Sequence, residues 1–407
     1  EMVKAVPEVK SLKRILVLFN IEFLEYLING AGVKPSKIEF GYDSELEGKF
    51  AQDFYKVKTF PVGSDIDQMK LALDGKGGRY DVVFSNPPYQ VQSVTQKGMK
   101  GNGSTHASAI YHEIVMYAID VLQPQYVCMI TPSRWMAGGR GLDDYRKRML
   151  ADKHIRMIQD FPTAKGPESV FDGANLPGGV SYFLWDRDYS NGCEFNGIQR
   201  DIGEFDVLVR DNVAHQILKK VLAKHEGAFC DTRVLPTIPF GLTTNFSKWV
   251  DKTEPCSTPC YARRRSVYFV KEEDFTDYHG VRSLWKIYGA RGTGHNGEIF
   301  SKERDNIGYR NVFLGEKGSI CTQTYLVLAS FRKKEDAIGY LRYTQTKFFQ
   351  FLMSLRTISQ MVSSDKFAWV PDLGDYSKAW TDEELYEHFG LTKQERDHIE
   401  KTIKSLD

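Results

Sequence analysis

The sequence of 407 residues lacks any long apolar run. Its longest apolar stretches, Ile15–Asn20 and Tyr325–Ala329, are far shorter than the roughly 20 residues that a helix needs to span a bilayer. The first ten residues contain no apolar region of the kind found in secretory signal peptides. We therefore expect no membrane insertion and no secretion, and we predict a cytoplasmic location.

Cysteine is scarce and scattered, with six residues in the whole chain. Only Cys256 and Cys260 lie close together in the sequence, and no second pair completes the four ligands of a structural zinc site. Such spacing is typical of reduced thiols in a cytoplasmic protein rather than of a disulfide framework. We predict no metal centre.

No charge of one sign dominates the chain, because 54 Lys and Arg stand against 53 Asp and Glu. The net charge of +1 by itself counts against a nucleic-acid binder, whose binding surface is usually basic. The distribution is uneven, however. Residues 1–245 carry a net charge of −1, residues 246–366 carry +7 and residues 367–407 carry −5. The basic excess in the C-terminal half predicts a surface for nucleic acid there.

The chain is apolar enough for an ordinary globular protein, with 42% apolar and 26% charged residues, and its length predicts two or three domains. Residues 1–190 alternate short β-type runs with amphipathic helical patterns, which predicts an α/β domain with a doubly wound, parallel sheet of seven strands. The predicted strands are residues 14–20, 37–43, 57–62, 80–85, 126–131, 155–161 and 178–185, and the predicted helices are 22–28, 45–54, 66–73, 107–122 and 142–150.

Residues 191–407 have a different texture and are predicted to form a second, mixed α+β domain. Short strand-like runs lie between about 226 and 330, and helices are expected at 213–224, 334–354, 382–389 and 393–405. Two of these helices begin with the Thr-x-x-Glu pattern of a capping box, at Thr381 and Thr392.

The motif Asn86-Pro87-Pro88-Tyr89 is the most informative part of the sequence. It directly follows the predicted fourth strand, at the edge where open α/β sheets place their active sites. The alternative is a turn that merely ends the strand, because proline cannot continue a ladder of backbone hydrogen bonds.

This motif and its position resemble the NPPY-type adenine-N6 DNA methyltransferases of restriction–modification systems. The order of cofactor motif, catalytic motif and C-terminal domain is similar to that of their gamma class, and the resemblance covers about residues 10–190. It implies a Rossmann-like methyltransferase sheet followed by a target-recognition domain. It also implies transfer of a methyl group from S-adenosylmethionine to a flipped adenine in double-stranded DNA, with Asn86, Pro87, Pro88 and Tyr89 as catalytic residues.

The residue types suit this chemistry. The amino group of adenine is a poor nucleophile, because its lone pair is delocalised into the ring. The Asn86 side chain and the Pro87 carbonyl can accept its two N–H groups and free the lone pair for attack. The two prolines hold these acceptors on a stiff backbone, and Tyr89 offers a flat face on which a flipped base can stack.

The resemblance places the cofactor at the ends of the first three strands. Its predicted contacts are Phe19, Asn20, Asp43, Ser64 and Asp65. Asp43 would take the ribose hydroxyls, and Ser64 and Asp65 would contact the adenine moiety; for both aspartates helix capping is the alternative. The turn after the first strand lacks the family's glycines. Either the pocket uses a different turn, or cofactor binding is weak or lost.

On the substrate side, the segment 131–135 with Arg134 and the segment 178–183 with Tyr182 resemble parts of the family's base pocket. Strand alternation allows only one of Tyr182 and Phe183 to face that pocket, and core packing is the alternative. Residues 92–105 are predicted to form a mobile loop over the active site, or a plain surface loop. The predicted DNA contacts in the basic region are Arg263, Arg264, Arg265 and Arg291, with a solvated edge strand as the alternative.

Three functions remain open from the sequence. The first is a site-specific DNA adenine-N6 methyltransferase, encoded by a bacterium or phage, with a possible cognate restriction enzyme as partner. The second uses the same chemistry on RNA or on a protein glutamine. The third is a catalytically weak or inactive DNA-binding subunit of a restriction–modification or phage-defence system, which the glycine-poor first turn suggests.

Overall fold

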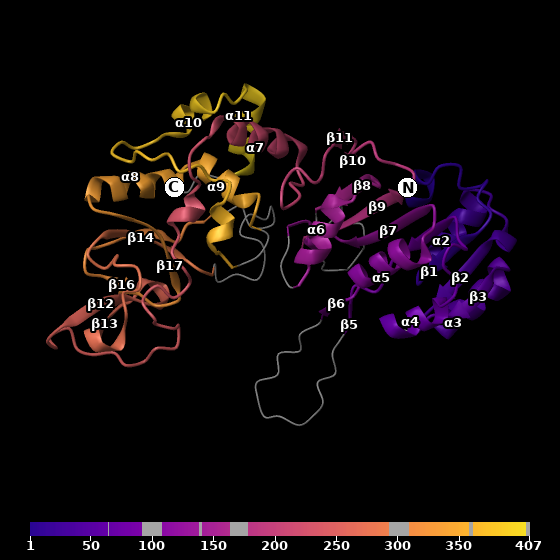
Figure 1. The fold of residues 1–407 in the computed structure, drawn as a ribbon, viewed down its shortest axis with the longest axis horizontal. Coiled ribbons are helices and arrows are strands. Elements are labelled where there is room, and N and C mark those ends of the chain that lie inside the picture. The colour runs from indigo at the N-terminus through magenta and orange to yellow at the C-terminus, as the bar shows by residue number, and fades with distance from the viewer. Residues whose placement is uncertain are drawn as a thin grey trace. The chain divides into compact units, whose positions relative to one another are not determined.

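In the computed structural model the chain forms two compact units, Glu1–Arg210 and Asp211–Asp407 (Figure 1). The structure describes residues 1–63, 65–91, 108–137, 141–162, 178–292, 309–357 and 361–403. The division falls 20 residues beyond the predicted boundary at 190. Residues 191–210 belong to the first unit, because β10 (Cys193–Phe195) pairs with its sheet and β11 (Ile198–Arg200) pairs with β10.

All seven predicted strands of the first unit are confirmed. They are β1 (Ile15–Leu18), β2 (Ile38–Tyr42), β3 (Lys58–Pro61), β4 (Val82–Ser85), β7 (Tyr126–Pro132), β8 (Ile155–Phe161) and β9 (Val180–Asp186). With β10 and β11 they form a nine-stranded sheet in the order β11-β10-β8-β9-β7-β4-β1-β2-β3. A short ladder of β5 (Gln90–Val91) and β6 (Ser108–Ala109) lies outside it.

The predicted parallel sheet is confirmed in part, because β9 runs antiparallel to both of its neighbours, β7 and β8. All seven residues of β9 are buried. A strand that is buried on both faces has the same continuous apolar pattern in either direction, so its sequence does not reveal the direction.

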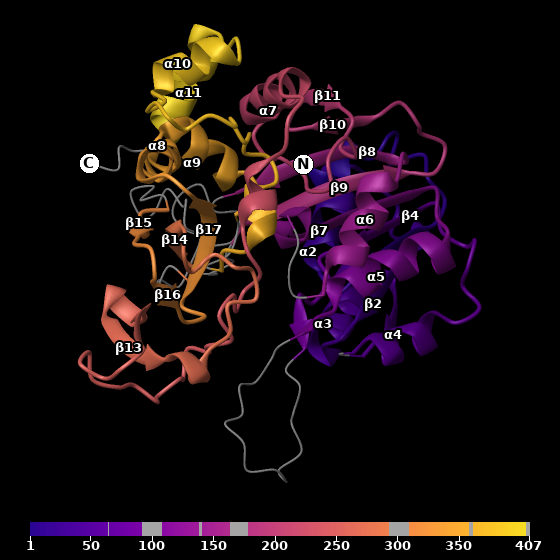
Figure 2. The same ribbon diagram turned by 60° about the vertical axis from the view of Figure 1, so that its left-hand side comes forward.

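Helices cover both faces of this sheet. On one face, α1 (Met2–Ala5), α2 (Glu22–Glu25) and the π-helical turn Ala51–Tyr55 after α3 (Glu45–Phe50) pack against alternate residues of β1. On the other face lie α4 (Ile66–Leu73), α5 (Tyr111–Tyr117) and α6 (Asp143–Ala151), as Figure 2 shows. The helix predicted from residue 107 begins at Tyr111 because Ser108–Ala109 pair with β5, and α1 was not predicted.

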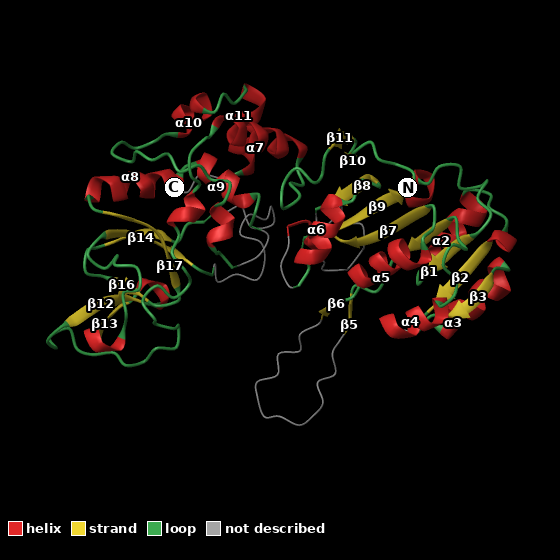
Figure 3. Ribbon diagram, in the orientation of Figure 1, coloured by secondary structure: helices red, strands yellow, loops and turns green. Residues whose placement is uncertain are grey.

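The second unit mixes strands and helices, as expected (Figure 3). Its sheets, β13-β12-β16 and β15-β14-β17, consist of β12 (Ser257–Tyr261), β13 (Val267–Lys271), β14 (Trp285–Ala290), β15 (Val312–Gly315), β16 (Ile320–Cys321) and β17 (Tyr325–Phe331). Its helices are α7 (Asn212–Lys224), α8 (Lys334–Gln345), α9 (Lys347–Ser354), α10 (Asp382–His388) and α11 (Lys393–Thr402).

The single helix predicted over 334–354 is two helices, because Thr346 has an extended backbone and its side chain caps Phe349 N. The capping boxes at Thr381 and Thr392 are both present, so the predicted starts of α10 and α11 are confirmed.

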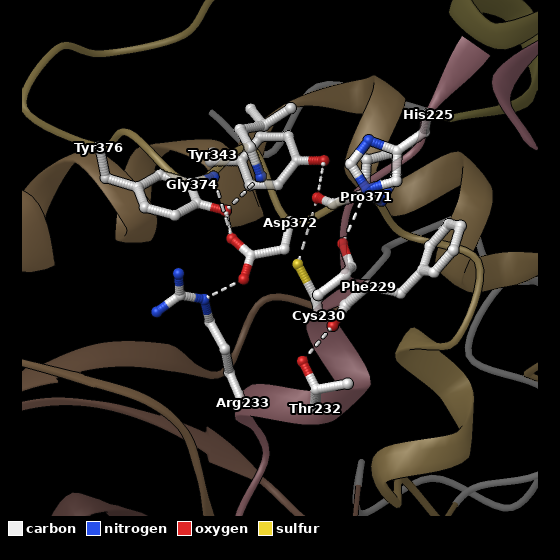
Figure 4. A network of polar contacts seen from close by, with 12 residues as sticks. His225, Phe229, Cys230, Thr232, Arg233, Tyr343, Pro371, Asp372, Gly374 and Tyr376 are labelled. Atoms are coloured by element: carbon white, nitrogen blue, oxygen red, sulfur yellow. Dashed lines mark hydrogen bonds and ion pairs between the residues drawn. The ribbon is translucent and has the colours of Figure 1, made fainter.

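A polar clasp joins two distant segments of the second unit (Figure 4). Arg233 forms an ion pair with Asp372, whose Oδ1 accepts a hydrogen bond of 2.8 Å from the Tyr376 hydroxyl. The Tyr343 hydroxyl and the Cys230 thiol both donate to the Pro371 carbonyl, at 2.9 and 3.4 Å. These contacts hold residues 370–376 against the segment around Cys230.

In the described part of the chain, no helix combines the length and the apolar character needed to cross a bilayer.

Lys286 of β14 is fully buried, and its Nζ donates to three backbone carbonyls. The distances are 2.7 Å to Leu284 O, 3.0 Å to Arg282 O and 3.3 Å to Val281 O. Burial lowers the pKa of this amine to about 8, although Asp277 opposes the change.

Because of the lowered pKa of Lys286, we expect the free energy of unfolding to depend on pH. Between pH 8 and about 10 the unfolded chain binds more protons at this position than the folded chain, so stability should rise with pH, by at most about 3 kcal/mol. Urea unfolding followed by tryptophan fluorescence at pH 7.5, 8.5 and 9.5 measures this slope. Lys286→Met should flatten it, whereas Lys317→Met at an exposed position should not. Equal slopes in the two variants would contradict this assignment.

Candidate active site

The strand order reverses between β1 and β4. From β1 the chain proceeds to β2 and β3 on one side, and β4 and β7 lie on the other. In open α/β sheets, ligands bind in the crevice outside the carboxyl ends of the strands at such a point. Leu18 pairs with Ser85, and the buried Ser85 hydroxyl donates to Leu18 O at 3.3 Å. Asn20 and Asn86 therefore follow their strands at nearly the same level of this edge.

A pocket of about 860 Å³ opens at this reversal point, and both Asn20 and Asn86 line it. The Asn20 side chain accepts a hydrogen bond of 2.8 Å from Glu22 N, so it also orders the start of α2. Glu22, Phe23 and Ile130 complete this part of the lining. The predicted contacts Asn20 and Asn86 are thus brought together in one pocket.

The N-terminal segment forms another wall of the pocket, which was not predicted. Val3, Val6 and Val9 are buried and line the pocket, and the Cys128 thiol of β7 donates to Met2 O at 3.6 Å. The spacing of three residues between these valines is the sequence signal that could have revealed this wall.

The turn after β1 forms without glycine. Phe19 adopts a left-handed conformation with φ of 68°, which is uncommon for a bulky residue. Its backbone N donates to Gly41 O of β2 at 2.9 Å, and its ring packs against the core. The chain therefore makes this turn with a phenylalanine in a left-handed conformation where the family has glycine.

Acidic side chains gather beside the pocket. Asp43 directly follows β2 and is exposed, and Glu47 lies in the first turn of α3. Partial burial raises the pKa of Glu47, and the nearby carboxylates of Asp43 and Glu22 raise it further. Of the three acids only Glu22, which was not predicted, is a lining residue among those described. A cationic ligand would relieve their mutual repulsion.

Asp65 caps α4, because its Oδ1 accepts a hydrogen bond of 2.9 Å from Gln68 N. Helix capping, the alternative reading of this residue, is therefore confirmed, and Asp65 is not among the described lining residues. Ser64 lies outside the described residues, as does the predicted loop 92–105.

The backbone around Tyr89 is fixed where the motif leaves the sheet. Tyr89 O accepts from Ile110 N at 3.3 Å, next to the ladder between β5 and β6. The Tyr89 ring meets the Tyr111 ring edge-on, with centroids 6.4 Å apart. Burial raises the pKa of Tyr89 well above its usual value, and its hydroxyl has no partner among the described residues.

An aromatic cluster extends from Tyr89 through Tyr111 to residues of the adjacent helices. Tyr145 contacts the rings of Tyr111, His112 and Trp135 at centroid distances of 6.1, 5.8 and 5.7 Å. Each of these side chains has a buried polar atom without a partner in the described part of the chain. Buried polar atoms are normally satisfied, so these atoms are exceptions within the described core.

Tyr182 and Phe183 face opposite sides of β9, as strand alternation requires. Tyr182 forms a small cluster with Ile130 of the pocket, against which Tyr89 packs, whereas Phe183 lies in the core on the other face. Arg134 lies close enough to Tyr111 to oppose the rise in that hydroxyl's pKa that burial causes. Tyr182 and Arg134 are therefore both near the motif.

The three consecutive arginines form the tip of the β12–β13 hairpin in the second unit. Arg264 and Arg265 both adopt left-handed conformations, with φ of 58° and 59°. Arg265 N donates to the Tyr325 hydroxyl at 2.8 Å, and its guanidinium lies over the Phe313 ring at 4.9 Å. Backbone strain of this kind persists only where surrounding contacts hold it.

All three arginines of this tip are exposed, and no carboxylate partner is found for them in the described residues. Next to them, the exposed Tyr268 ring stacks on Trp249 with centroids 4.7 Å apart. Arg291 lies at the end of β14, where its backbone N donates to Thr324 O at 3.0 Å.

The described residues contain no group of three or more His, Cys, Asp or Glu side chains that could hold a metal ion. Cys260 is buried in β12 while Cys256 is exposed, and all six cysteines are free.

Residues 13–167 match the family model described as Eco57I restriction-modification methylase. The resemblance to restriction–modification methylases is confirmed for this segment. An "uncharacterized adenine-specific methylase" of Mycoplasma pneumoniae is 32% identical over 148 residues, which are 36% of this chain and 32% of that protein. The chain thus spans about a third of the length of this relative.

Two solved structures match the chain at low sequence identity. The type IIG restriction endonuclease BpuSI is 10% identical, with a TM-score of 0.42, over 99% of this chain and 64% of that chain. The methyltransferase subunit of a type I restriction-modification system from Streptococcus thermophilus is 13% identical, with a TM-score of 0.35, over 47% of this chain and 43% of that chain.

The observed helix cap of Asp65 and its predicted cofactor contact can be tested separately. Asp65→Ala removes the cap of α4 and should lower the free energy of unfolding by about 1 kcal/mol, measured by urea denaturation. Asp65→Ser keeps a capping oxygen and should recover most of that loss. If Asp65→Ser retains stability but loses affinity for S-adenosylmethionine in calorimetry, the carboxylate serves the cofactor as well as the helix.

Proposed function

We propose that the protein is a site-specific DNA adenine-N6 methyltransferase, which transfers a methyl group from S-adenosylmethionine to a flipped adenine in duplex DNA. The observation that carries this proposal is the position of Asn86-Pro87-Pro88-Tyr89. The motif follows β4 at the reversal point of the sheet, and Asn86 shares a pocket with Asn20 from the end of β1. The match of residues 13–167 to a restriction-modification methylase model and the 32% identity with an adenine-specific methylase over 148 residues support the same chemistry.

The pocket suits S-adenosylmethionine in size. Its volume of about 860 Å³ is in the range of cofactor sites. Val6 and Phe23 of the lining provide apolar surface for an adenine ring, and Glu22 provides a carboxylate for ribose hydroxyls or an ammonium group, with Asp43 beyond the described lining. The bound cofactor supplies the electrophilic methyl group; every other requirement falls on the chain itself.

The motif supplies the acceptors that the reaction needs. Asn86 Oδ1 and Pro87 O accept the two N–H groups of the target amine, which localises its lone pair. Pro87 is buried and both prolines restrict the backbone, so the acceptors need no rearrangement. Tyr89, held edge-on by Tyr111, presents its ring to the base, and Tyr182 and Arg134 border the same space.

The duplex is proposed to contact the second unit through the hairpin tip of Arg263, Arg264 and Arg265, with Arg291 as a further contact. This region carries the basic excess of the chain, with a net charge of +7 over residues 246–366. The exposed arginines suit phosphates and guanine edges, and Tyr268 on Trp249 offers an aromatic surface beside them.

A second candidate is a catalytically weak or inactive DNA-binding subunit of a restriction–modification or phage-defence system. The observation that favours it is Phe19, a bulky residue in a strained conformation where the family has glycines. The intact motif at residues 86–89 favours the active enzyme.

The first test uses Asn86→Ala with labelled S-adenosylmethionine and duplex DNA, RNA or protein as acceptor. Wild type should label DNA as N6-methyladenine, and Asn86→Ala should lower kcat by roughly 100-fold or more, because one positioned acceptor is lost. Asn191→Ala, in an exposed turn, is the matched control and should be unaffected.

Other outcomes point elsewhere. Label in RNA or protein instead of DNA would replace the substrate class while keeping the chemistry. Absence of cofactor binding by wild type in calorimetry would overturn the proposal and favour the inactive subunit.

The hairpin is tested by the salt dependence of DNA binding. Arg263→Ala combined with Arg264→Ala should reduce the slope of log affinity against log salt by roughly 1 to 2. Each phosphate contact that is lost means that fewer counterions are released when DNA binds. Fluorescence anisotropy with a labelled duplex measures this slope. Lys393→Ala with Lys401→Ala on α11 removes the same charge elsewhere in the second unit. An unchanged slope in the arginine variant would show that the hairpin does not contact DNA.

A further inference from the structure

Another cavity of the first unit lies at the amino ends of β1 and its neighbours, the edge opposite to Asn20 and Asn86. Its volume is about 420 Å³. Five basic side chains and a single acid line it, an excess of four positive charges. These charged residues, which together define the basic pocket, are Lys13, Arg14, Lys37, Lys58, Arg79 and Glu39.

The sheet itself gathers these charges. Ile15 of β1 pairs with Ile38 of β2 and with Val82 of β4, and Glu39 of β2 pairs with Lys58 of β3. Because parallel strands in register begin at the same level, the basic residues just before them are placed side by side. The cluster is therefore anchored where these strands begin, with Lys58 inside β3 and the other cations in the segments that lead into the strands.

The acids near the pocket are already engaged. Glu39 accepts from Lys58 Nζ at 3.0 Å and from the Tyr80 hydroxyl at 2.8 Å, and it lies 3.6 Å from Lys76 Nζ. Burial alone would raise the pKa of Glu39, but these partners hold it below its usual value. Asp81 Oδ2 accepts from the backbone N of Lys13 and of Arg14, at 2.6 and 3.0 Å.

The remaining cations have no carboxylate partner in the described part of the chain. Lys37 Nζ donates to Lys10 O at 2.9 Å, and Arg14 Nη1 donates to Arg79 O at 3.4 Å. These backbone contacts orient the side chains without neutralising them. Four like charges around one concavity repel each other, and a concave surface focuses their field, so the site favours an anion.

We propose that the basic pocket binds a small ligand with two or more linked phosphate groups, either an inorganic oligophosphate or a nucleoside polyphosphate. Linked phosphates match an excess of several charges spread over one cavity, and Lys and Arg are the side chains that bind them best. The volume suits a small molecule, whereas a duplex is too wide to enter. The site is separate from the proposed methyl transfer, which uses the opposite edge of the sheet.

Isothermal titration calorimetry with sodium tripolyphosphate, in magnesium-free buffer and on the full chain, tests the proposal. Wild type should bind one equivalent, and sodium sulfate at equal ionic strength should not reproduce the signal. Lys37→Gln with Arg79→Gln should weaken binding roughly tenfold or more. Lys49→Gln with Lys147→Gln removes the same charge from exposed helix positions and should bind like wild type.

ATP in place of tripolyphosphate distinguishes the two sources: tighter binding of ATP assigns a nucleotide, and equal binding assigns the phosphates alone. An excess of S-adenosylmethionine should not displace either probe. The proposal is overturned if no heat is detected at millimolar tripolyphosphate, or if both double variants bind like wild type. It is also overturned if a 20-base-pair duplex displaces the probe from wild type, because the basic pocket would then be a nucleic-acid surface. Loss of methyl transfer with intact tripolyphosphate binding would concern only the opposite edge.

Discussion

The parallel pairing of β1 with β4 is the interaction on which the candidate active site depends. It places Leu18 opposite Ser85 in the buried centre of the sheet, and the Ser85 hydroxyl reaches across to Leu18 O. A slip of one residue would turn every side chain of one strand to the other face, so the core on both faces fixes this register. Asn20 and Asn86 owe their shared pocket to that constraint.

The same edge provides two contrasting environments. On the side of β1 and β2, the carboxylates of Glu22, Asp43 and Glu47 lie close together and favour a cation. On the side of β4, an aromatic cluster around Tyr111 backs Tyr89 and leaves buried polar atoms unsatisfied. Methyl transfer from a sulfonium to a base needs a cation and a flat, polar ring to meet at one point. Asn86 lines the pocket, and Tyr89 of the same motif contacts Tyr111 of the aromatic cluster, so the motif reaches both environments.

Acidic and basic side chains lie in different parts of this chain, although its net charge is only +1. Within the first unit the carboxyl edge of the sheet gathers acids, whereas the amino edge gathers the cations of the basic pocket. Parallel strands make this possible, because all their amino ends lie at one edge and all their carboxyl ends at the other. The second unit carries its own excess of exposed arginines on a strained hairpin.

The sequence by itself determined the features that local patterns encode. These include the seven strands of the first unit, the capping boxes at Thr381 and Thr392, and the motif at the end of β4. Tertiary structure alone decided the antiparallel direction of β9 and the addition of β10 and β11. It also assigned Asp65 to a helix cap and brought Glu22 into the pocket. Each of these depends on contacts between residues far apart in the chain or on a choice between two uses of one side chain, and neither leaves a periodic signal in the sequence.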